Sequence, residues 1–152
     1  MSSIEVKIKY MSSKIGKEIR EPFYATTGSA GADLSACIDT PIRLKPGEKA
    51  IIPTGVAVQL PSNEYVALIF ARSGLGIKHG ITMSNGVGVI DSDYTGEIMC
   101  GLINLGKEDY TINPGERIAQ MVFMPVVTAS FLKVDELEET ERGQGGLGST
   151  GR

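Results

Sequence analysis

Apolar and polar residues alternate along this chain in short runs that glycine and proline separate. This period of two, together with frequent β-branched residues, predicts strands. The predicted strands are Ile4–Tyr10, Ala32–Ile38, Ala50–Leu60, Tyr65–Phe70, Val87–Ile90, Glu97–Asn104 and Arg117–Phe123. A helix of a turn or two is expected only around Ser73–Lys78. Pro46 with Gly47, and Pro114 with Gly115, are typical of turns between strands. The pattern predicts an all-β fold, as a sandwich, barrel or jelly roll.

The length of 152 residues, of which 41% are hydrophobic, suits one domain with a buried core. The composition changes after Val134. Asp135–Glu141 is acidic, and Arg142–Arg152 contains five glycines and little that could be buried. We therefore expect residues 1–134 to form the domain and residues 135–152 to form a flexible C-terminal arm that is disordered when alone.

Charge and hydropathy exclude several classes of partner. The net charge is -3 and no basic stripe is present, so we expect no binding to nucleic acid. The N-terminal run alternates apolar and charged residues, unlike a signal peptide, and no segment has the roughly 20 apolar residues of a membrane helix. We expect a cytoplasmic protein that does not bind membranes. Cys37, Cys100 and one histidine are too few for a Cys/His zinc site, so both cysteines are interpreted as buried free thiols.

Five stretches combine polar residues with glycine in ways that strand packing does not require. In the first, Asp33 interrupts an apolar strand, either as a paired residue at the strand end or as a group that holds a hydrated metal ion. In the second, Ala71–Gly76, backbone N–H groups and Ser73 at a helix start form an anion site to which Arg72 adds donors. The alternative is that Ser73 and Gly74 only cap a turn.

Of the other three stretches, the hairpin and the arm also allow two interpretations. Asn85–Met99 is predicted to be a β-hairpin with Asp91 just beyond its first arm, or an exposed tip that has aspartates for turn formation. In Asn113–Phe123, Glu116 and Arg117 lie beside a turn, and Gln120 lies in an apolar strand, where glutamine usually bonds to the backbone. The glycines of the arm could expose backbone N–H donors to phosphate oxygens. The alternative is that the arm is simply disordered.

In this order and spacing, the five stretches resemble the five ordered motifs of the homotrimeric dUTPase family (deoxyuridine 5'-triphosphate nucleotidohydrolases). The resemblance runs from about Ala30 to Arg152, and Ile4–Tyr10 fits the family's first strand. It departs at Leu147, where the family usually has Phe. The resemblance implies a distorted jelly-roll β-barrel with one short helix and a flexible C-terminal arm. It also implies a homotrimer in which each active site is built from three chains.

The implied activity is Mg²⁺-dependent hydrolysis of dUTP to dUMP and pyrophosphate, which limits uracil incorporation into DNA and supplies dUMP for thymidylate synthesis. By resemblance, Asp91 activates the water that attacks the α-phosphorus, and Asp33 contacts Mg²⁺ through water. Asn85 and the backbone near Val89, Ile90 and Met99 would read uracil, with Tyr94 beneath the deoxyribose. The resemblance assigns the following residues to the phosphates, to closure of the arm or to support of the site: Arg72, Ser73, Gly74, Arg117, Gln120, Arg142, Leu147, Gly148, Ser149 and Thr150.

Two alternatives belong to other classes. A dCTP deaminase, or a bifunctional deaminase and dUTPase, would use the same barrel, but such chains usually run longer and lack this tail. Ammonia release from dCTP would distinguish them. A non-catalytic jelly-roll binding module would satisfy the strand pattern, but a degenerate homologue is expected to have lost at least one of Asp91, Tyr94, Arg72 and Arg142.

Overall fold

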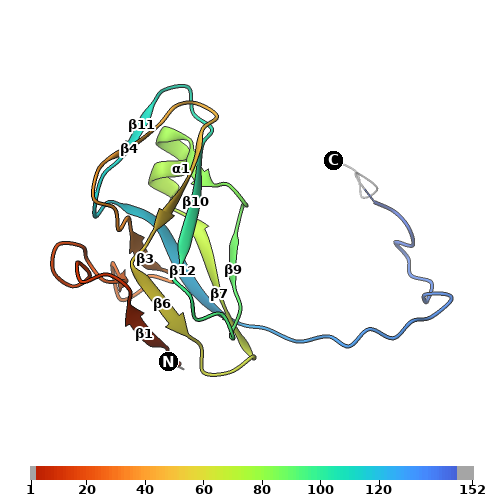
Figure 1. Ribbon diagram of the computed structural model, residues 1–152. Coiled ribbons are helices and arrows are strands. Elements are labelled where there is room, and N and C mark those ends of the chain that lie inside the picture. Colours follow the sequence, from red (N-terminus) through yellow and green to blue (C-terminus); the bar gives the residue numbers. More distant parts are fainter. Residues whose placement is uncertain (1–2, 147–152) are drawn as a thin grey trace.

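The computed structural model describes residues 3–146, and its regular structure is almost entirely β-strand (Figure 1). One helix, α1 (Ser73–His79), follows the seventh strand. The strands are β1 (Lys7–Tyr10), β2 (Phe23–Tyr24), β3 (Ala32–Ser35), β4 (Ile42–Leu44), β5 (Lys49–Pro53), β6 (Val56–Gln59), β7 (Tyr65–Ala71), β8 (Ile81–Met83), β9 (Gly88–Ile90), β10 (Met99–Asn104), β11 (Tyr110–Ile112) and β12 (Arg117–Pro125). The prediction of an all-β fold with one short helix is confirmed.

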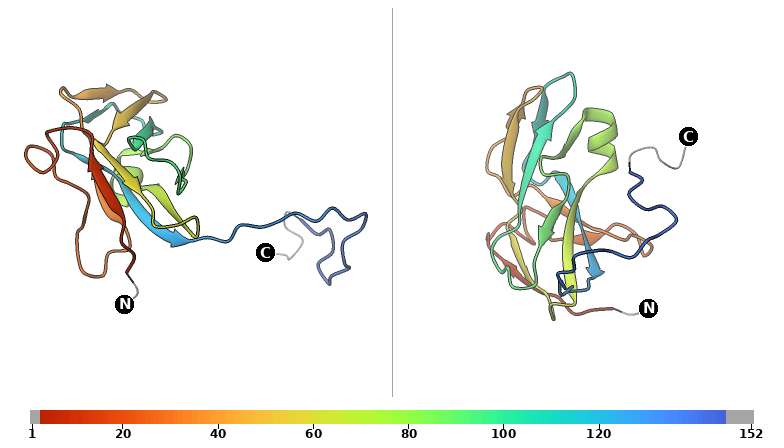
Figure 2. Two further views of the ribbon diagram at one scale, coloured as in Figure 1. Left: turned by 60° about the horizontal axis from the view of Figure 1, so that its bottom comes forward. Right: turned by 90° about the vertical axis from the view of Figure 1, so that its right-hand side faces the viewer.

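The strands form small antiparallel sheets around a common interior, as the two views of Figure 2 show. The largest sheet has the order β2-β3-β12-β7-β9, and a second has the order β5-β10-β8. Two pairs, β1-β6 and β11-β4, complete the arrangement. Inward-pointing residues from several strands, such as Leu34, Ile52, Ile69 and Leu102, make one hydrophobic core. The strands packed on this core position the polar stretches of the sequence.

The prediction of one strand over Ala50–Leu60 is wrong, because the run contains β5 and β6. The break lies at Thr54 and Gly55. Gly55 has a φ of 72°, and the Thr54 hydroxyl donates to the Ile98 carbonyl at 2.7 Å. The backbone therefore turns while its apolar character continues, so β5 pairs with β10 and β6 pairs with β1. Periodicity alone does not detect a turn whose residues are all buried.

The prediction of a β-hairpin over Asn85–Met99 is also wrong in its pairing. β9 pairs with β7, whereas β10 pairs with β5 and β8. β8 and β10 form the true arms, and the residues between them cross to the other sheet. A Cβ atom on Gly88 would lie 3.0 Å from Cβ of Ile69, so glycine permits this close approach of β9 to β7. The loop therefore joins the two sheets.

Other strand limits differ because backbone partners change along a run. β3 ends at Ser35 instead of Ile38, since the Ala36 and Cys37 amides donate to Glu116 and Pro53, which lie on different segments. β1 begins at Lys7 instead of Ile4. Four strands were not predicted, because two or three residues are too few to show a period; they are β2, β4, β8 and β11. Both predicted turns are confirmed at Gly47 and Gly115, where φ is positive.

Beyond β12 the described chain, through residue 146, contains no helix or strand and runs away from the body (Figure 1). Several of its apolar side chains are almost fully exposed, with Val127 at 95% and Phe131 at 98%. The assignment of residues 135–152 to a flexible arm stays a prediction. Within residues 3–146, α1 is too short to cross a bilayer, and no other helix is present.

Candidate active site

Asp33 is the centre of a cluster of charged groups at the end of the large sheet where β7 ends and β12 begins. Its side chain lies on β3 and is only 11% exposed. Oδ1 accepts a hydrogen bond from Nε of Arg72 at 3.0 Å, and Oδ2 accepts one from an Nη of Arg117 at 2.9 Å. The Arg72 guanidinium also donates to the Arg117 carbonyl at 3.2 Å. Asp33 is therefore paired with two arginines, one on each carboxylate oxygen.

Gln120 supports the same cluster from the neighbouring strand. On β12 it lies opposite Asp33 on one side and Phe70 on the other. Its side-chain amide donates to the carbonyl of Ala71, the residue before Arg72, at 3.1 Å. A Cβ atom on Gly31 would lie 2.8 Å from the Gln120 amide oxygen, so glycine leaves room for this side chain. The expectation that Gln120 bonds to the backbone is confirmed.

Ser73 and Gly74 begin α1 and are both exposed. Arg72 is the N-cap residue with an extended backbone, and no side chain caps the helix. The alternative in which Ser73 only caps a turn is therefore wrong. The first N–H groups of a helix have no partner within it and favour an anion. Beside two guanidinium groups, this helix start gives the cluster a positive surface that suits phosphate oxygens.

Tyr110 connects the cluster to the far end of α1. Its ring packs on His79 with centroids 4.9 Å apart, and its hydroxyl donates to Glu116. Burial and the Glu116 carboxylate raise the pKa of Tyr110 to about 12, and nearby Arg72 opposes this shift. Glu116 also accepts a hydrogen bond from the Asn113 amide at 2.9 Å. Glu116 thus fixes the turn before β12. No motif near Tyr110 in the sequence indicates these contacts.

The second group of predicted residues lies on the loop between β8 and β10. Asp91 and Asn85 are exposed, and the Asp91 carbonyl accepts the Tyr94 amide at 3.1 Å. Tyr94 is held by its hydroxyl, which donates to the Glu97 carbonyl at 2.8 Å. A Cβ atom on Gly96 would lie 2.7 Å from that hydroxyl oxygen, so glycine allows the ring to fold over the chain. Val89 and Met99 are exposed apolar residues on the same loop and the following strand.

Comparison with known proteins shows the family to which the chain belongs. The sequence model of the dUTPase family matches residues 17–151. The deoxyuridine 5'-triphosphate nucleotidohydrolase of Serratia proteamaculans (strain 568) is 51% identical over 152 residues, which cover 100% of this chain and 99% of that relative. The chain belongs to the dUTPase family.

Solved dUTPase structures confirm the fold. Staphylococcus bacteriophage 80alpha dUTPase with dUPNHPP has a TM-score of 0.85 and 30% identity, and covers 97% of this chain and 99% of its own. A mutant dUTPase from phage phi11 of S. aureus, described for the coordination of a structural Mg(II) ion, has a TM-score of 0.76 and 26% identity. That match covers 89% of this chain and 99% of the phage chain. The predicted jelly-roll β fold of dUTPases is therefore present.

Among the residues that a dUTPase site was predicted to contain, one chain brings together Asp33, Arg72, Arg117 and Gln120, with Ser73 and Gly74 beside them. The loop residues lie apart from this group. Ile90 pairs with Ala67, five residues before Arg72, so Asp91 lies toward the opposite end of β7 from Arg72, with roughly 20 Å between their backbone positions. Arg142 bonds only locally among the described contacts, from its Nε to the Gly145 carbonyl at 2.9 Å.

The predicted arm residues Leu147, Gly148, Ser149 and Thr150 lie outside the described residues.

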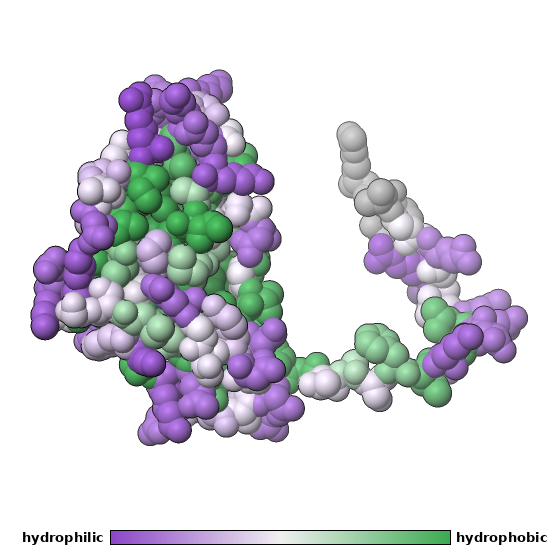
Figure 3. Space-filling model, in the orientation of Figure 1, coloured by the Kyte–Doolittle hydropathy of each residue, from purple (hydrophilic) through white to green (hydrophobic). Residues whose placement is uncertain are grey.

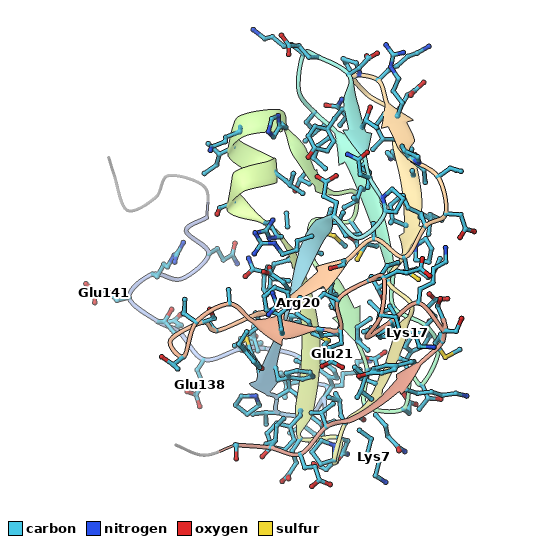
Figure 4. The ribbon with its side chains drawn as sticks, turned by 90° about the vertical axis from the view of Figure 1, so that its left-hand side faces the viewer. Lys7, Lys17, Arg20, Glu21, Glu138 and Glu141 are labelled. Atoms are coloured by element: carbon cyan, nitrogen blue, oxygen red, sulfur yellow. The ribbon has the colours of Figure 1, made fainter. Side chains whose placement is uncertain are left out.

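One further basic residue near the cluster, Arg20, was not predicted from the sequence. It lies before β2 on the side of the molecule seen in Figure 4, with its guanidinium 3.3 Å from the centre of the Phe23 ring. Arg20, Phe23 and Arg117 line a shallow hollow with Ser35 and Gly115. No motif indicates Arg20, since only the tertiary fold brings it near Arg117.

Proposed function

We propose that this member of the dUTPase family hydrolyses dUTP to dUMP and pyrophosphate. The observation that carries the proposal is the family match over nearly the whole chain, together with the arginine cluster that the fold assembles from β3, α1 and β12. In a cell this reaction would limit uracil incorporation into DNA and supply dUMP for thymidylate synthesis.

The positive cluster is proposed to bind the phosphate chain. Arg72 is held through two of its donors, and a guanidinium has five N–H groups, so it keeps donors for phosphate oxygens. Ser73 and Gly74 add the N–H groups of the helix start. From the arm, Arg142, Gly148, Ser149 and Thr150 would close over the phosphates. Leu147 would cover the base, as an apolar contact in place of the family's aromatic ring.

Asp91 is proposed to be the general base. It takes a proton from the water that attacks the α-phosphorus, as the bond from that phosphorus to the bridging oxygen of pyrophosphate breaks. A positioned base typically contributes about 10²–10⁴-fold to the rate. Positioning and charge neutralisation by the arginines would supply most of the remaining acceleration. Asp91 is exposed in a single chain, which supports the proposal that substrate and neighbouring chains cover it in the assembled site.

The loop between β8 and β10 is proposed to select the deoxyuridine part. Asn85 and backbone groups near Val89, Ile90 and Met99 would bond to uracil. Cytosine reverses donor and acceptor at two of these positions, at about 1–3 kcal/mol for each group left unpaired. Tyr94 would lie beneath the deoxyribose and leave no space for a 2'-hydroxyl. Its bond to Glu97 and its contact with Gly96 support a rigid ring in this place.

Mg²⁺ is the proposed cofactor. Within residues 3–146 no group of three or more His, Cys, Asp and Glu residues could form a protein cage for a metal ion. This fits Mg²⁺, which keeps several waters and binds through substrate phosphates and few carboxylates. Asp33 is the carboxylate of the phosphate cluster and would contact the ion through water. When bound, the ion would neutralise phosphate charge.

A homotrimer with shared sites is proposed as the working form. The backbone positions of Asp91 and Arg72 lie roughly 20 Å apart in one chain, and this separation supports a site that takes Asp91 from one chain and Arg72 from another. Exposed apolar residues support such an assembly. Ile51 and Met99 are exposed on the body, and Phe131 and Leu132 are exposed on the arm. Figure 3 shows hydrophobic surface on one face of the body and on part of the arm.

The decisive test is to incubate purified protein with dUTP, UTP, dTTP or dCTP, with Mg²⁺ or with EDTA. We expect monophosphate and pyrophosphate from dUTP alone, and only with Mg²⁺. Ammonia release from dCTP would instead indicate a deaminase. No product from any nucleotide would contradict the proposed function, provided that the protein is folded by circular dichroism.

A further inference from the structure

The two arginines of the phosphate cluster share one carboxylate. Each oxygen of Asp33 accepts one guanidinium, from Arg72 at 3.0 Å and from Arg117 at 2.9 Å. The Arg72 and Arg117 side chains are 26% and 45% exposed, so both reach solvent beyond the buried carboxylate. The bond from Arg72 to the Arg117 carbonyl ties the two residues to each other.

Two like charges so close together repel each other, most strongly where burial lowers the dielectric constant. A carboxylate between them offsets this repulsion and sets the direction of each guanidinium plane, because the fork geometry of arginine is rigid. The bonds use Nε of Arg72, so its side chain cannot rotate without losing one of them. The remaining donors are therefore aimed before any ligand binds, which lowers the entropic cost of binding.

We propose that Asp33 is a positioning residue that aims Arg72 and Arg117 at the phosphate chain, and that this role does not depend on the metal ion. The inference rests on the proposed function in one respect, namely that the anion bound at this cluster is the triphosphate of the substrate. It differs from a role in the water shell of Mg²⁺, because a positioning role acts on nucleotide affinity when no metal ion is present.

The test is to titrate wild-type protein and the Asp33→Asn variant with dUpNHpp, once in EDTA and once with saturating Mg²⁺, by calorimetry. Asparagine offers one acceptor oxygen and places N–H donors toward the other guanidinium. We expect binding about tenfold weaker in the variant in EDTA, and a loss at least as large with Mg²⁺. Unchanged or tighter binding in EDTA, with a loss only in Mg²⁺, would overturn the positioning role and assign Asp33 to the metal.

If Asp33→Asn is less stable, a double-mutant cycle with Arg117→Gln still measures the coupling between the two residues in nucleotide affinity. If Asp33 acts through Arg117, the loss of affinity caused by Arg117→Gln should be much smaller in the Asp33→Asn background than in wild type. Losses that simply multiply would contradict the coupling. Asp39→Asn is the matched control, because Asp39 is an exposed carboxylate that pairs with Lys14. It should bind dUpNHpp like wild type.

A measurement without nucleotide separates this inference from the proposed function. In ¹H–¹⁵N spectra of ligand-free protein, the Arg72 Nε–H signal, assigned with Arg72→Lys, should exchange slowly with water and should lose that protection in Asp33→Asn. Equal protection in both proteins would overturn the inference even if dUTP is hydrolysed. A protected signal in a protein that does not hydrolyse dUTP would overturn the proposed function alone.

Discussion

At the scale of single residues, the candidate site contains two kinds of side chain. Asp33, Arg72 and Gln120 are held by hydrogen bonds within one chain. Asn85 and Asp91 are exposed, and only their backbone is held by the loop. Groups of the first kind are aimed before substrate arrives, so they suit electrostatic stabilisation. Groups of the second kind gain their full effect when substrate and neighbouring chains exclude water from them.

Asp91→Asn should lower kcat on dUTP by at least about 10²-fold, because a neutral amide cannot accept the proton of the attacking water. Binding of dUpNHpp should change little, since asparagine has nearly the size of aspartate and the arginine cluster that is proposed to hold the phosphates stays intact. Steady-state kinetics and calorimetry on the same protein would check both expectations. Asp93→Asn is the matched control on the same turn, and near-normal turnover of Asp91→Asn would remove Asp91 from the base role.

Cys100 gives a prediction for the dependence of stability on pH. Burial raises the pKa of its thiol from 9.0 to about 12. Between these values the unfolded chain loses the proton while the folded chain keeps it, so the free energy of unfolding falls as pH rises. Urea unfolding at pH 8 and pH 10.5 would measure this fall, which should be smaller in Cys100→Ala. An equal fall in both proteins would show that other groups cause it.

At the scale of elements, two connections place the site. The turn at Thr54 and Gly55 sends β5 and β6 to different partners, and the Gly55 amide donates to Glu97 at 2.8 Å. Glu97 belongs to the loop that carries Asp91 and Tyr94, so this turn supports the loop. The crossing from β8 through β9 to β10 then sets where that loop projects.

Gly55→Ala should destabilise the fold by about 2–4 kcal/mol, which combines a left-handed backbone with overpacking. Its Cβ would lie 2.7 Å from Sγ of Cys37 and from Cδ1 of Ile15. Gly47→Ala is the matched control, because φ is also positive there but no atom lies within 4 Å. Its cost should be about 1 kcal/mol. Equal shifts in thermal unfolding would show that packing around Gly55 relaxes freely.

Deletion of Arg142–Arg152 should abolish most hydrolysis of dUTP and leave the melting temperature almost unchanged. The described part of the arm, up to residue 146, contributes nothing to the hydrophobic core, so its loss removes ligand contacts instead of packing. Differential scanning calorimetry and an activity assay would check this. A truncated protein that melts much lower or changes its mass in solution would show that the arm stabilises the fold or the assembly.

At the scale of the whole molecule, the separation of the loop from the arginine cluster predicts complementation between chains. Asp91→Asn and Arg72→Ala should each be nearly inactive alone. After joint unfolding and refolding in equal amounts, about a quarter of wild-type activity should return, since each residue is intact in half of the chains at random assembly. Sedimentation would confirm that mixed assemblies form. If no activity returns in them, both residues act from one chain, which contradicts the shared site.

The sequence alone determined the fold class, the helix at Ser73, the turns at Gly47 and Gly115, and the family. These depend on local backbone preference and on short motifs, which are readable without knowing what packs against them. It did not determine where the buried Thr54–Gly55 turn divides a run, or that β9 crosses to β7. Those depend on which backbone groups find partners far away in the sequence.

The tertiary structure also decided what the polar residues touch. From the sequence, Asp33 is a carboxylate in an apolar strand with two open interpretations. The fold brings Arg72 from β7 and α1, and Arg117 from β12, to its two oxygens. Antiparallel pairing of β3 with β12 and of β12 with β7 creates that meeting point, and no local pattern encodes it. The sequence therefore shows which residue types could bind phosphate, whereas the orientation of their side chains depends on the order of strands in one sheet.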